Sequence, residues 1–249
     1  MLMKTILDLI YPDSLYCICC SKLIDESRPY RLCNDCMAGI KWSVGPCCAK
    51  CGKPLSPSNP METCFSCREH SHVFRKGYTV AEYGSFERSI VFALKYNART
   101  DIAGTLGEMI FDKIRQELQG ADLRDEYDLI VPMPMHDAKK MKRGYNQAEL
   151  IARAVAKLSG AAYHGDILQR TRETTALRGL SPEQRRIEIK GAFAFREKCE
   201  PLVCGARVLL IDDIYTTGAS CDEASGLLLA GGASVVDIAS FSAGADVVK

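Results

Sequence analysis

The distribution of apolar and polar residues changes character near residue 77. Beyond this point, apolar residues three and four positions apart predict helices at residues 85–96, 100–118, 146–160 and 221–233. Short runs rich in Val, Ile and Leu predict strands at residues 77–83, 127–134, 192–195, 207–212 and 234–241. Strands of this kind alternating with helices indicate an α/β domain with a largely parallel sheet. Such sheets bind their ligands at the carboxyl ends of the strands.

Before residue 77 the chain holds ten of its thirteen cysteines, and they form an internal repeat. Cys17-x2-Cys20 is followed after twelve residues by Cys33-x2-Cys36, and the same arrangement recurs 31 positions later as Cys48, Cys51, Cys64 and Cys67. Two Cys-x2-Cys turns complete a tetrahedral site of four thiolates, and this closed set leaves no position for a substrate. We therefore predict two structural zinc sites in a first domain of residues 1–76, followed by a second domain of residues 77–249.

The cysteine pattern also allows other interpretations. Four thiolates suit iron in a rubredoxin-like site, and buried structural thiols are a further alternative. Cys19 and Cys47 each adjoin a predicted ligand, so either could shift the ligand register by one residue. The twelve-residue gap inside each set has room for a small hairpin. The isolated Cys199, Cys204 and Cys221 are predicted to be small core residues.

The composition, with 47% apolar and 25% charged residues among 249, is ordinary for a soluble globular protein. No apolar run approaches the roughly 18–20 residues that span a bilayer. The apolar N-terminus is interrupted by Asp8 and Pro12 and lacks the features of a signal peptide. We expect a cytoplasmic protein whose first residues form a short amphipathic helix presenting Leu2, Ile6 and Leu9.

The net charge is only +1, but basic residues concentrate in one central stretch. Residues 136–190 hold 12 Lys and Arg against 6 Asp and Glu, which indicates an anionic ligand there. Residues 1–76 hold 10 against 7, and eight thiolates with two zinc ions lower this balance to about −1. Association with DNA should therefore depend more on the central stretch, with Lys139, Lys140 and Lys142, than on the cysteine repeat. A solvated basic turn is the alternative interpretation of these lysines.

The stretch VLLIDDIYTTGAS, residues 208–220, places two adjacent carboxylates after an apolar strand. We expect Asp212 and Asp213 to leave the strand, and the next turn to enter a helix whose first amides and hydroxyls cradle a phosphate. Gly218 lets backbone amides approach a ligand closely. Because two carboxylates can accept hydrogen bonds from vicinal hydroxyls, the predicted ligand is a sugar diol beside a phosphate, as in ribose 5-phosphate. Without a ligand the two charges should repel, so removing either is expected to leave the protein equally or more stable.

Two alternatives compete with this interpretation. A Walker B strand also ends in acidic residues, but it needs a G-x-x-x-x-G-K-[ST] loop. The chain's one Gly-Lys pair, Gly52-Lys53, lies inside the cysteine repeat and precedes Pro54. The second alternative is a helix N-cap that happens to carry another aspartate. The four histidines have no spacing that singles them out as metal ligands.

The same stretch matches the phosphoribosyl pyrophosphate (PRPP) motif of type I phosphoribosyltransferases, which is an apolar strand, two acids, then T-T-G-x-[ST]. Together with the double zinc ribbon, the chain resembles the ComF (ComFC) family of competence-associated proteins over nearly its whole length. The segments at residues 94–98, 131–156 and 170–193 follow in the family's order, and R-G-[FY]-N-Q at residues 143–147 is the most specific. The resemblance implies a type I phosphoribosyltransferase-like fold, with a mostly parallel sheet flanked by helices.

The resemblance also implies a role for each part of the site. Asp212 and Asp213 would hold the ribose hydroxyls and are the candidate catalytic residues. The candidate PRPP-binding residues are Asp212, Asp213, Tyr215, Thr216, Thr217, Gly218, Ala219 and Ser220, of which Thr216 to Ser220 would bind the 5-phosphate. The loop of Met133, Pro134 and Met135 would present amides to pyrophosphate, and Arg143 would neutralise its charge. Residues 170–190 would form a mobile hood over PRPP, and Mg²⁺ would bridge the diol and the pyrophosphate.

Two hood residues depart from the family pattern, because Leu177 stands where Gln is usual and Glu188 stands where Asn is usual. One hypothesis is therefore an enzyme that transfers phosphoribosyl from PRPP to an unidentified acceptor. The second is a catalytically weak protein that binds PRPP or single-stranded DNA and acts with DNA-uptake proteins in transformation or regulation. A redox or metal-sensing module is a third hypothesis, which closed four-cysteine sites disfavour.

Overall fold

A computed structural model describes residues 15–174 and 179–246 of the chain. The N-terminal helix expected to present Leu2, Ile6 and Leu9, and the hood position Leu177, lie outside the described residues. Within the described ranges, no helix has the length and apolar character needed to cross a membrane.

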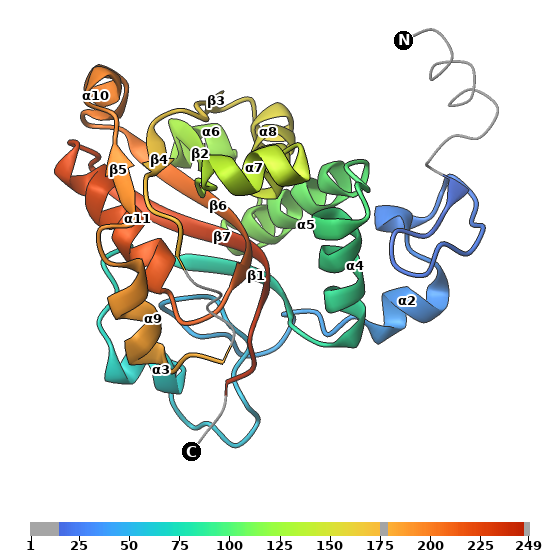
Figure 1. Cartoon of the computed structure of the whole chain (residues 1–249). Helices are drawn as coiled ribbons and strands as arrows, with labels where there is room; N and C mark the ends of the chain where they lie inside the picture. The colour runs from blue at the N-terminus through green and yellow to red at the C-terminus, as the bar shows by residue number, and fades with distance from the viewer. Residues whose placement is uncertain (1–14, 175–178, 247–249) are drawn as a thin grey trace, which may run out of the picture.

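The centre of the molecule is a five-stranded parallel sheet (Figure 1). Its order is β1 (Gly77–Glu82), β7 (Val235–Ala243), β6 (Arg207–Tyr215), β2 (Leu129–Pro132) and β3 (Ala162–Tyr163). Every neighbouring pair in this sheet is parallel. A separate antiparallel pair joins β4 (Leu168–Arg170) to β5 (Phe193–Phe195). The predicted mostly parallel sheet flanked by helices is confirmed.

Helices cover both faces of the sheet, and the central strand β6 shows why its sequence is continuously apolar. Leu209 and Ile211 belong to a core shared with α4 (Ser85–Tyr96), α5 (Ile102–Glu117) and α8 (Gln147–Ser159). Val208 and Leu210 belong to a second core, shared with α11 (Ala219–Ala230). Alternate side chains of one strand thus enter different cores, and both sets must be apolar.

Strand β6 is longer than the sequence predicts, which changes the setting of the two aspartates. Pairing with β7 continues to Tyr215 opposite Ala243, so Asp212 and Asp213 lie within the strand and do not leave it. On the other side, β2 ends at Pro132 opposite Ile211. Proline has no N–H with which to extend the ladder. The aspartates therefore lie where one neighbouring strand has ended and the other continues.

Several short elements had no clear sequence signal. They are η2 (Pro29–Arg31), α6 (Leu123–Glu126), α7 (Asp137–Arg143), α9 (Pro182–Ile189), η3 (Glu197–Cys199) and α10 (Glu200–Val203). Helix α9 lies within the segment expected to be a loop-like hood. Its start is defined by Pro182 at the first helical position and by a capping box between Ser181 and Gln184. The polar composition of this segment hid a helix that is specified by its cap.

The cysteine repeat is also a repeat of backbone structure. The amides of Cys17 and Cys48 donate to the carbonyls of Lys22 and Lys53 at 2.9 and 2.8 Å. These bonds close the turn around the first Cys-x2-Cys of each set, beside the isolated bridges Tyr16–Leu23 and Cys47–Pro54. The second Cys-x2-Cys begins a short helix in each set, α2 (Asn34–Gly39) and α3 (Phe65–Glu69). The expected hairpin therefore surrounds the first cysteine pair and does not fill the twelve-residue gap.

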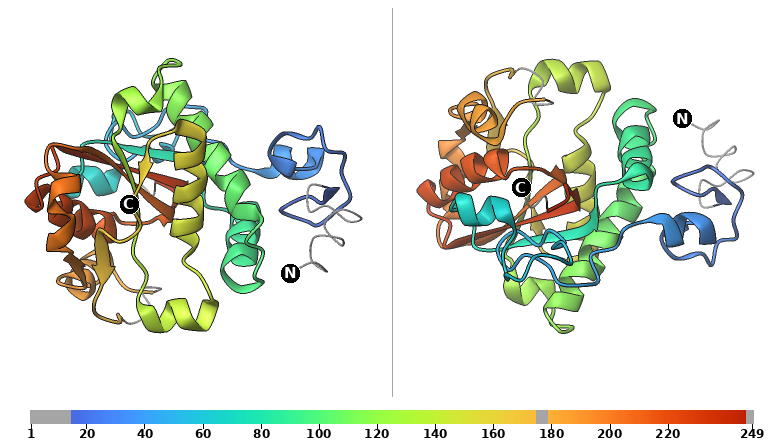
Figure 2. Two further views of the ribbon diagram at one scale, coloured as in Figure 1. Left: turned by 90° about the horizontal axis from the view of Figure 1, so that it is seen from above. Right: turned by 90° about the horizontal axis from the view of Figure 1, so that it is seen from below.

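The first ribbon (residues 17–36) and the second ribbon (residues 48–67) pack against different parts of the α/β region. Figure 1 shows α2 to one side of α4, whereas α3 lies at the opposite side of the view. Figure 2 shows the same separation from above and below. In the first ribbon, the Tyr30 hydroxyl donates to Asp112 of α5 at 2.8 Å. Cysteines of the second ribbon belong to the core that contains α11.

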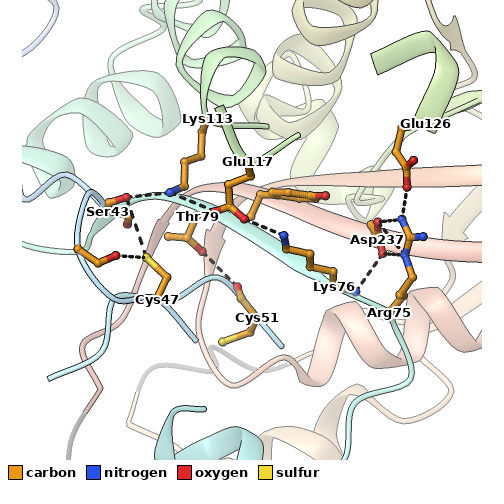
Figure 3. A network of polar contacts seen from close by, with 12 residues as sticks. Ser43, Cys47, Cys51, Arg75, Lys76, Thr79, Lys113, Glu117, Glu126 and Asp237 are labelled. Atoms are coloured by element: carbon orange, nitrogen blue, oxygen red, sulfur yellow. Dashed lines mark hydrogen bonds and ion pairs between the residues drawn. The ribbon is translucent and has the colours of Figure 1, made fainter. Parts of the chain in front are cut away.

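The segment that joins the ribbons to the sheet is held by a polar network (Figure 3). Arg75 forms an ion pair with Asp237 of β7, whose side chain is fully buried. Lys76 lies 2.8 Å from Glu117 of α5. Charged side chains thus anchor this segment to β7 and to α5. The division into domains at residue 77 stays a prediction, and the two parts share both hydrophobic cores.

Candidate functional site

A cavity of about 560 Å³ opens at the carboxyl end of β6 and β2. It is lined by Tyr83, Arg88, Lys95, Tyr96, Met133, Pro134, Met135, Lys139, Arg143, Asn146, Gln147, Ala148, Arg170, Arg185, Asp212, Asp213, Ile214, Thr216 and Ser220. Eight of these were predicted from the sequence as site residues: Met133, Pro134, Met135, Arg143, Asp212, Asp213, Thr216 and Ser220. Tyr215, Thr217, Gly218 and Ala219 were also predicted but do not line it.

The carboxylate pair forms part of the cavity floor. Asp213 is buried and Asp212 is half-buried. The Asp213 amide donates to Asp212 Oδ1 at 2.8 Å. Gln147 Nε2 donates to Asp213 Oδ1 at 3.1 Å, and Lys95 of α4 forms an ion pair with Asp213 Oδ2. Asp213 is therefore held by a cation and an amide, whereas no side chain among the described residues donates to Asp212.

These contacts separate the two carboxyl groups electrostatically. Burial, and then the neighbouring Asp213 carboxylate, raise the pKa of Asp212 well above its usual range. Burial also opposes ionisation of Asp213, but the Lys95 ammonium outweighs it and lowers the pKa of Asp213 below its usual value. The pair therefore carries its first negative charge on Asp213. A ligand that donates hydrogen bonds or brings positive charge would allow Asp212 to ionise as well.

The turn from β6 into α11 has the shape of an anion cradle. Gly218 adopts φ of +82°, which side chains other than glycine rarely allow, and it is the N-cap of α11. A Cβ atom at this position would lie 2.5 Å from His72 Cε1. The Thr217 hydroxyl is buried and has no hydrogen-bond partner among the described residues. Backbone amides and an unused hydroxyl at the start of a twelve-residue helix suit a phosphate group.

The loop after β2 offers fewer amides than the sequence suggests. The Met133 amide already donates to the carbonyl of Ile211 at 2.8 Å, because it continues the strand ladder. Pro134 has no N–H. Only the Met135 amide of this trio is left for a ligand within the described part of the chain. Asn146 Nδ2 fixes the loop by donating to the Met133 carbonyl at 2.9 Å.

The eight predicted cysteines form two groups, apart from the cavity. In each group the four Sγ atoms lie within 4.8 Å of one another, as Cys17, Cys20, Cys33 and Cys36 and as Cys48, Cys51, Cys64 and Cys67. Cys19 Sγ faces the Phe86 carbonyl at 3.8 Å, and Cys47 Sγ faces the Gly45 carbonyl at 3.3 Å, so neither belongs to a group. Two sets of four converging thiolates fit structural zinc. Of the isolated cysteines, Cys199 and Cys221 are buried as predicted, but Cys204 is exposed.

Comparison with known proteins agrees with this arrangement. Residues 6–68 match the model of the double zinc ribbon domain family. Over 209 residues the chain is 27% identical to DNA utilization protein YhgH of Salmonella typhimurium, covering 84% of this chain and 88% of that one. It is 27% identical over 197 residues to competence protein F of Haemophilus influenzae, with 79% and 83% coverage. It is 23% identical over 244 residues to competence protein ComFC of Bacillus subtilis, with 92% and 94% coverage. The chain thus resembles these competence and DNA utilization proteins over most of its length.

Solved structures similar to this chain are more distant. One is described as the allosteric regulatory enzyme of purine biosynthesis, with 18% identity and a TM-score of 0.37, covering 60% of this chain and 29% of that one. Another is phosphoribosylpyrophosphate synthetase from Mycobacterium smegmatis, with 18% identity and a TM-score of 0.34, covering 57% and 38%. This chain thus spans less than two fifths of either solved chain.

The cavity holds more positive charge than the sequence motifs reveal. Six cationic side chains line it against two carboxylates: Arg88, Lys95, Lys139, Arg143, Arg170 and Arg185. Arg88 and Lys95 come from α4, and Arg170 and Arg185 come from the two ends of the hood. Burial lowers the pKa of Arg170, and its Nε has no hydrogen-bond partner among the described residues. This excess of positive charge favours binding of an anionic ligand.

The hood differs in detail from the sequence expectation. Glu188 does not line the cavity, because its backbone carbonyl and its carboxylate face Arg172 at 2.6 and 3.8 Å. Tyr145 packs against the core and donates to the Leu94 carbonyl. The basic stretch of residues 136–190 was the available signal for Arg170 and Arg185. For Lys95, the only sequence signal was its place in the segment of residues 94–98, which follows the family pattern.

Proposed function

We propose that this chain binds PRPP with Mg²⁺ in the cavity at the end of β6 and acts as a phosphoribosyltransferase-family protein in DNA uptake. The observation that supports this most is the meeting of three features in one cavity. They are the Asp212 and Asp213 pair, the turn into α11, from which Thr216 and Ser220 line the cavity, and a six-to-two excess of cations over carboxylates. The role in DNA uptake is supported by relatives named competence protein F and ComFC.

The residues divide between the parts of the ligand. Asp212 and Asp213 would accept hydrogen bonds from the two ribose hydroxyls, and Asp212 would ionise on doing so. The amides and hydroxyls of the cradle would bind the 5-phosphate. The Met135 amide, with Arg143 and Lys139 of α7, would bind pyrophosphate. Carboxylate oxygens also suit Mg²⁺, which would supply charge neutralisation between the diol and the pyrophosphate.

Such a site works by holding the ligand and stabilising charge, so it does not require a dedicated base. The acceptor's nucleophilic atom forms a bond to C1 of the ribose. The bond from C1 to the pyrophosphate oxygen breaks, its electron pair leaves with pyrophosphate, and the acceptor releases its proton. Arg143, Arg170 and Arg185 are placed around the cavity to stabilise the departing negative charge.

Calorimetry and a product assay test this proposal on the full zinc-loaded chain. We expect PRPP to bind in the presence of Mg²⁺ and to bind less tightly when Mg²⁺ is chelated. Pyrophosphate release should rise when the correct acceptor is added from a panel of bases, nucleosides and amines. Binding without release across the panel would favour the catalytically weak alternative. Absence of PRPP binding by the folded chain would end the proposal.

The alternative function, binding of single-stranded DNA, is favoured by one surface feature. Phe92 and Tyr96 of α4 are 49% and 66% exposed, and their ring centroids lie 4.7 Å apart. The Arg143 guanidinium lies 5.5 Å from the Tyr96 ring centroid. Exposed aromatic rings beside basic side chains are a common way of binding unpaired bases.

A salt titration tests whether DNA binding uses the central basic stretch. Reversing the charges of Lys139, Lys140 and Lys142 should flatten the log–log salt dependence by about 0.7 for each single-strand phosphate that these lysines neutralise. The matched control reverses three exposed charges of the ribbon region, at Lys22, Lys41 and Arg68, and should leave the slope unchanged. Normal DNA binding by the first variant, together with failure of the control variant to bind, would contradict the charge argument.

A further inference from the structure

His72, a residue that sequence analysis set aside, lies between the second ribbon and the anion cradle. Its side chain is fully buried, five positions after the last cysteine ligand of that ribbon. Its ring stacks on Phe74 with centroids 4.9 Å apart. On the other side it faces Gly218, where a Cβ would meet it at 2.5 Å. The imidazole therefore supports the cradle residue that has to be glycine.

The hydrogen bonds of His72 fix its orientation. Nδ1 lies 2.8 Å from Asp222 Oδ2, and Nε2 lies 3.3 Å from the Tyr215 hydroxyl. A carboxylate can only accept, so Nδ1 donates to Asp222, and Nε2 is left to face the Tyr215 hydroxyl. Tyr215 ends β6 and Asp222 lies in the first turn of α11. One imidazole thus bridges the residues on both sides of the cradle.

Asp222 connects three parts of the chain. Its Oδ1 accepts from the Val73 amide at 3.0 Å, beside the contact with His72. Its Oδ2 also accepts from Arg186 of α9 at 3.4 Å, and α9 packs along α11 (Figure 1). The segment that directly follows the second ribbon, the cradle helix and the hood helix therefore meet at one carboxylate.

The second ribbon and the segment that follows it also pack around Tyr215. Phe74 meets the Tyr215 ring edge to face at 6.3 Å, and the Lys53 ammonium lies 6.0 Å from its centroid. Tyr215 belongs to the same core as Cys48, Cys51 and Cys64. The first ribbon instead contacts α4 and α5, for example through Arg31 and Asp101 at 3.0 Å. The two ribbons share a sequence pattern but have different neighbours.

We propose that the second ribbon is a structural part of the anion site, and that His72 and Asp222 are positioning residues through which its metal centre holds the phosphate cradle in shape. Loss of metal from the second site should loosen the cradle, and loss from the first should not. The affinity part of this proposal rests on the proposed PRPP function. The part that concerns the structural order of the cradle, measured by amide hydrogen exchange, does not depend on that function.

The repeat supplies a matched pair of variants, because Cys33 and Cys64 occupy equivalent positions and both cap short helices. Cys33→Ala and Cys64→Ala should each lose one zinc. Cys64→Ala should speed amide hydrogen exchange in residues 216–224 and weaken PRPP–Mg²⁺ binding at least about tenfold, as loss of charge-assisted hydrogen bonds predicts. Cys33→Ala should change neither property.

Variants at His72 keep the proposal testable if Cys64→Ala fails to fold. His72→Phe keeps a ring against Phe74 but has no donor for Asp222, so it should weaken PRPP binding about tenfold and speed exchange in residues 216–224. His72→Asn places an amide donor near Nδ1 and should restore most of both properties. Similar effects of His72→Phe and His72→Asn, or equal cradle exchange in the Cys33 and Cys64 variants, would overturn the proposal. If the wild-type chain binds no PRPP, the function proposal fails, and hydrogen exchange alone decides this one.

Discussion

Removal of zinc is expected to unfold both ribbons, residues 17–67, and to destabilise the rest of the molecule. Structural zinc in small finger peptides contributes roughly 10–16 kcal/mol of apparent free energy at neutral pH. The ribbons have little core of their own, and their cysteines belong to the two cores that also hold the sheet. Circular dichroism and thermal melting during titration with a chelator should show loss of structure below the melting temperature of the metal-loaded protein.

Metal analysis measures the zinc content that this prediction requires. We expect two zinc ions per chain, and one after substitution of either Cys33 or Cys64. The matched controls are Cys19→Ala and Cys47→Ala, since both residues adjoin a ligand and face backbone carbonyls instead. These controls should retain both ions. Fewer than one zinc per wild-type chain, or iron in its place, would contradict the two-site description.

Substitution of either aspartate of the β6 pair by asparagine is expected to weaken PRPP binding about tenfold to a hundredfold. Each change removes a charge-assisted hydrogen bond to a ribose hydroxyl, which contributes roughly 1.5–3 kcal/mol. Calorimetry with PRPP and Mg²⁺ measures the loss. Gly218→Val should abolish PRPP binding for two reasons. The valine side chain would collide with the His72 ring, and valine would have to adopt a left-handed backbone conformation, which it strongly disfavours.

The same two substitutions should differ in the absence of ligand, which corrects the expectation drawn from the sequence. Asp212→Asn removes a carboxyl group whose pKa is raised by burial and by the neighbouring Asp213 carboxylate. This substitution should therefore leave the protein equally or more stable. Asp213→Asn leaves the Lys95 ammonium, whose side chain is only 20% exposed, without its ion pair. This loss should destabilise the empty protein by about 1.5–3 kcal/mol. Repulsion between the two carboxylates therefore accounts for the effect expected at Asp212 but not for the effect expected at Asp213.

The pH dependence of unfolding follows from the two pKa directions. A carboxyl group with a raised folded pKa stabilises the protein at low pH, and this contribution is lost as pH rises through that value. Asp212→Asn should therefore gain most stability over the wild type at pH values above the folded pKa of Asp212. Asp213, with a lowered pKa, stabilises above its ordinary value and loses this contribution as pH falls through the folded one. Asp213→Asn should therefore reduce the stability of the protein least at acidic pH.

Thermal melts across this pH range, alongside the calorimetry, decide the role of the pair. If both asparagine variants destabilise the empty protein equally and leave PRPP affinity unchanged, the pair is structural. The phosphoribosyltransferase proposal would then fall with it.

The sequence alone was sufficient for features that depend on near neighbours in the chain. The two sets of four cysteines follow from short spacings, and the apolar runs of β6 and β7 reveal strands buried on both faces. Helix α4 spans the predicted residues 85–96, because its apolar period and Asn97 at its C-cap are local. The Asp212–Ser220 stretch marked, for the same reason, the end of the sheet at which the cavity opens.

Tertiary structure decided what depends on residues far apart in sequence. Pairing with β7 carried β6 past both aspartates, and α4 brought Lys95 to only one of them. The contact between His72 and Asp222 joins residues 150 positions apart, so no local pattern could distinguish His72 from the other histidines. Likewise, two ribbons with one spacing pattern differ in role because each packs against a different neighbour. Local sequence specifies the elements, and their packing selects which side chains share a site.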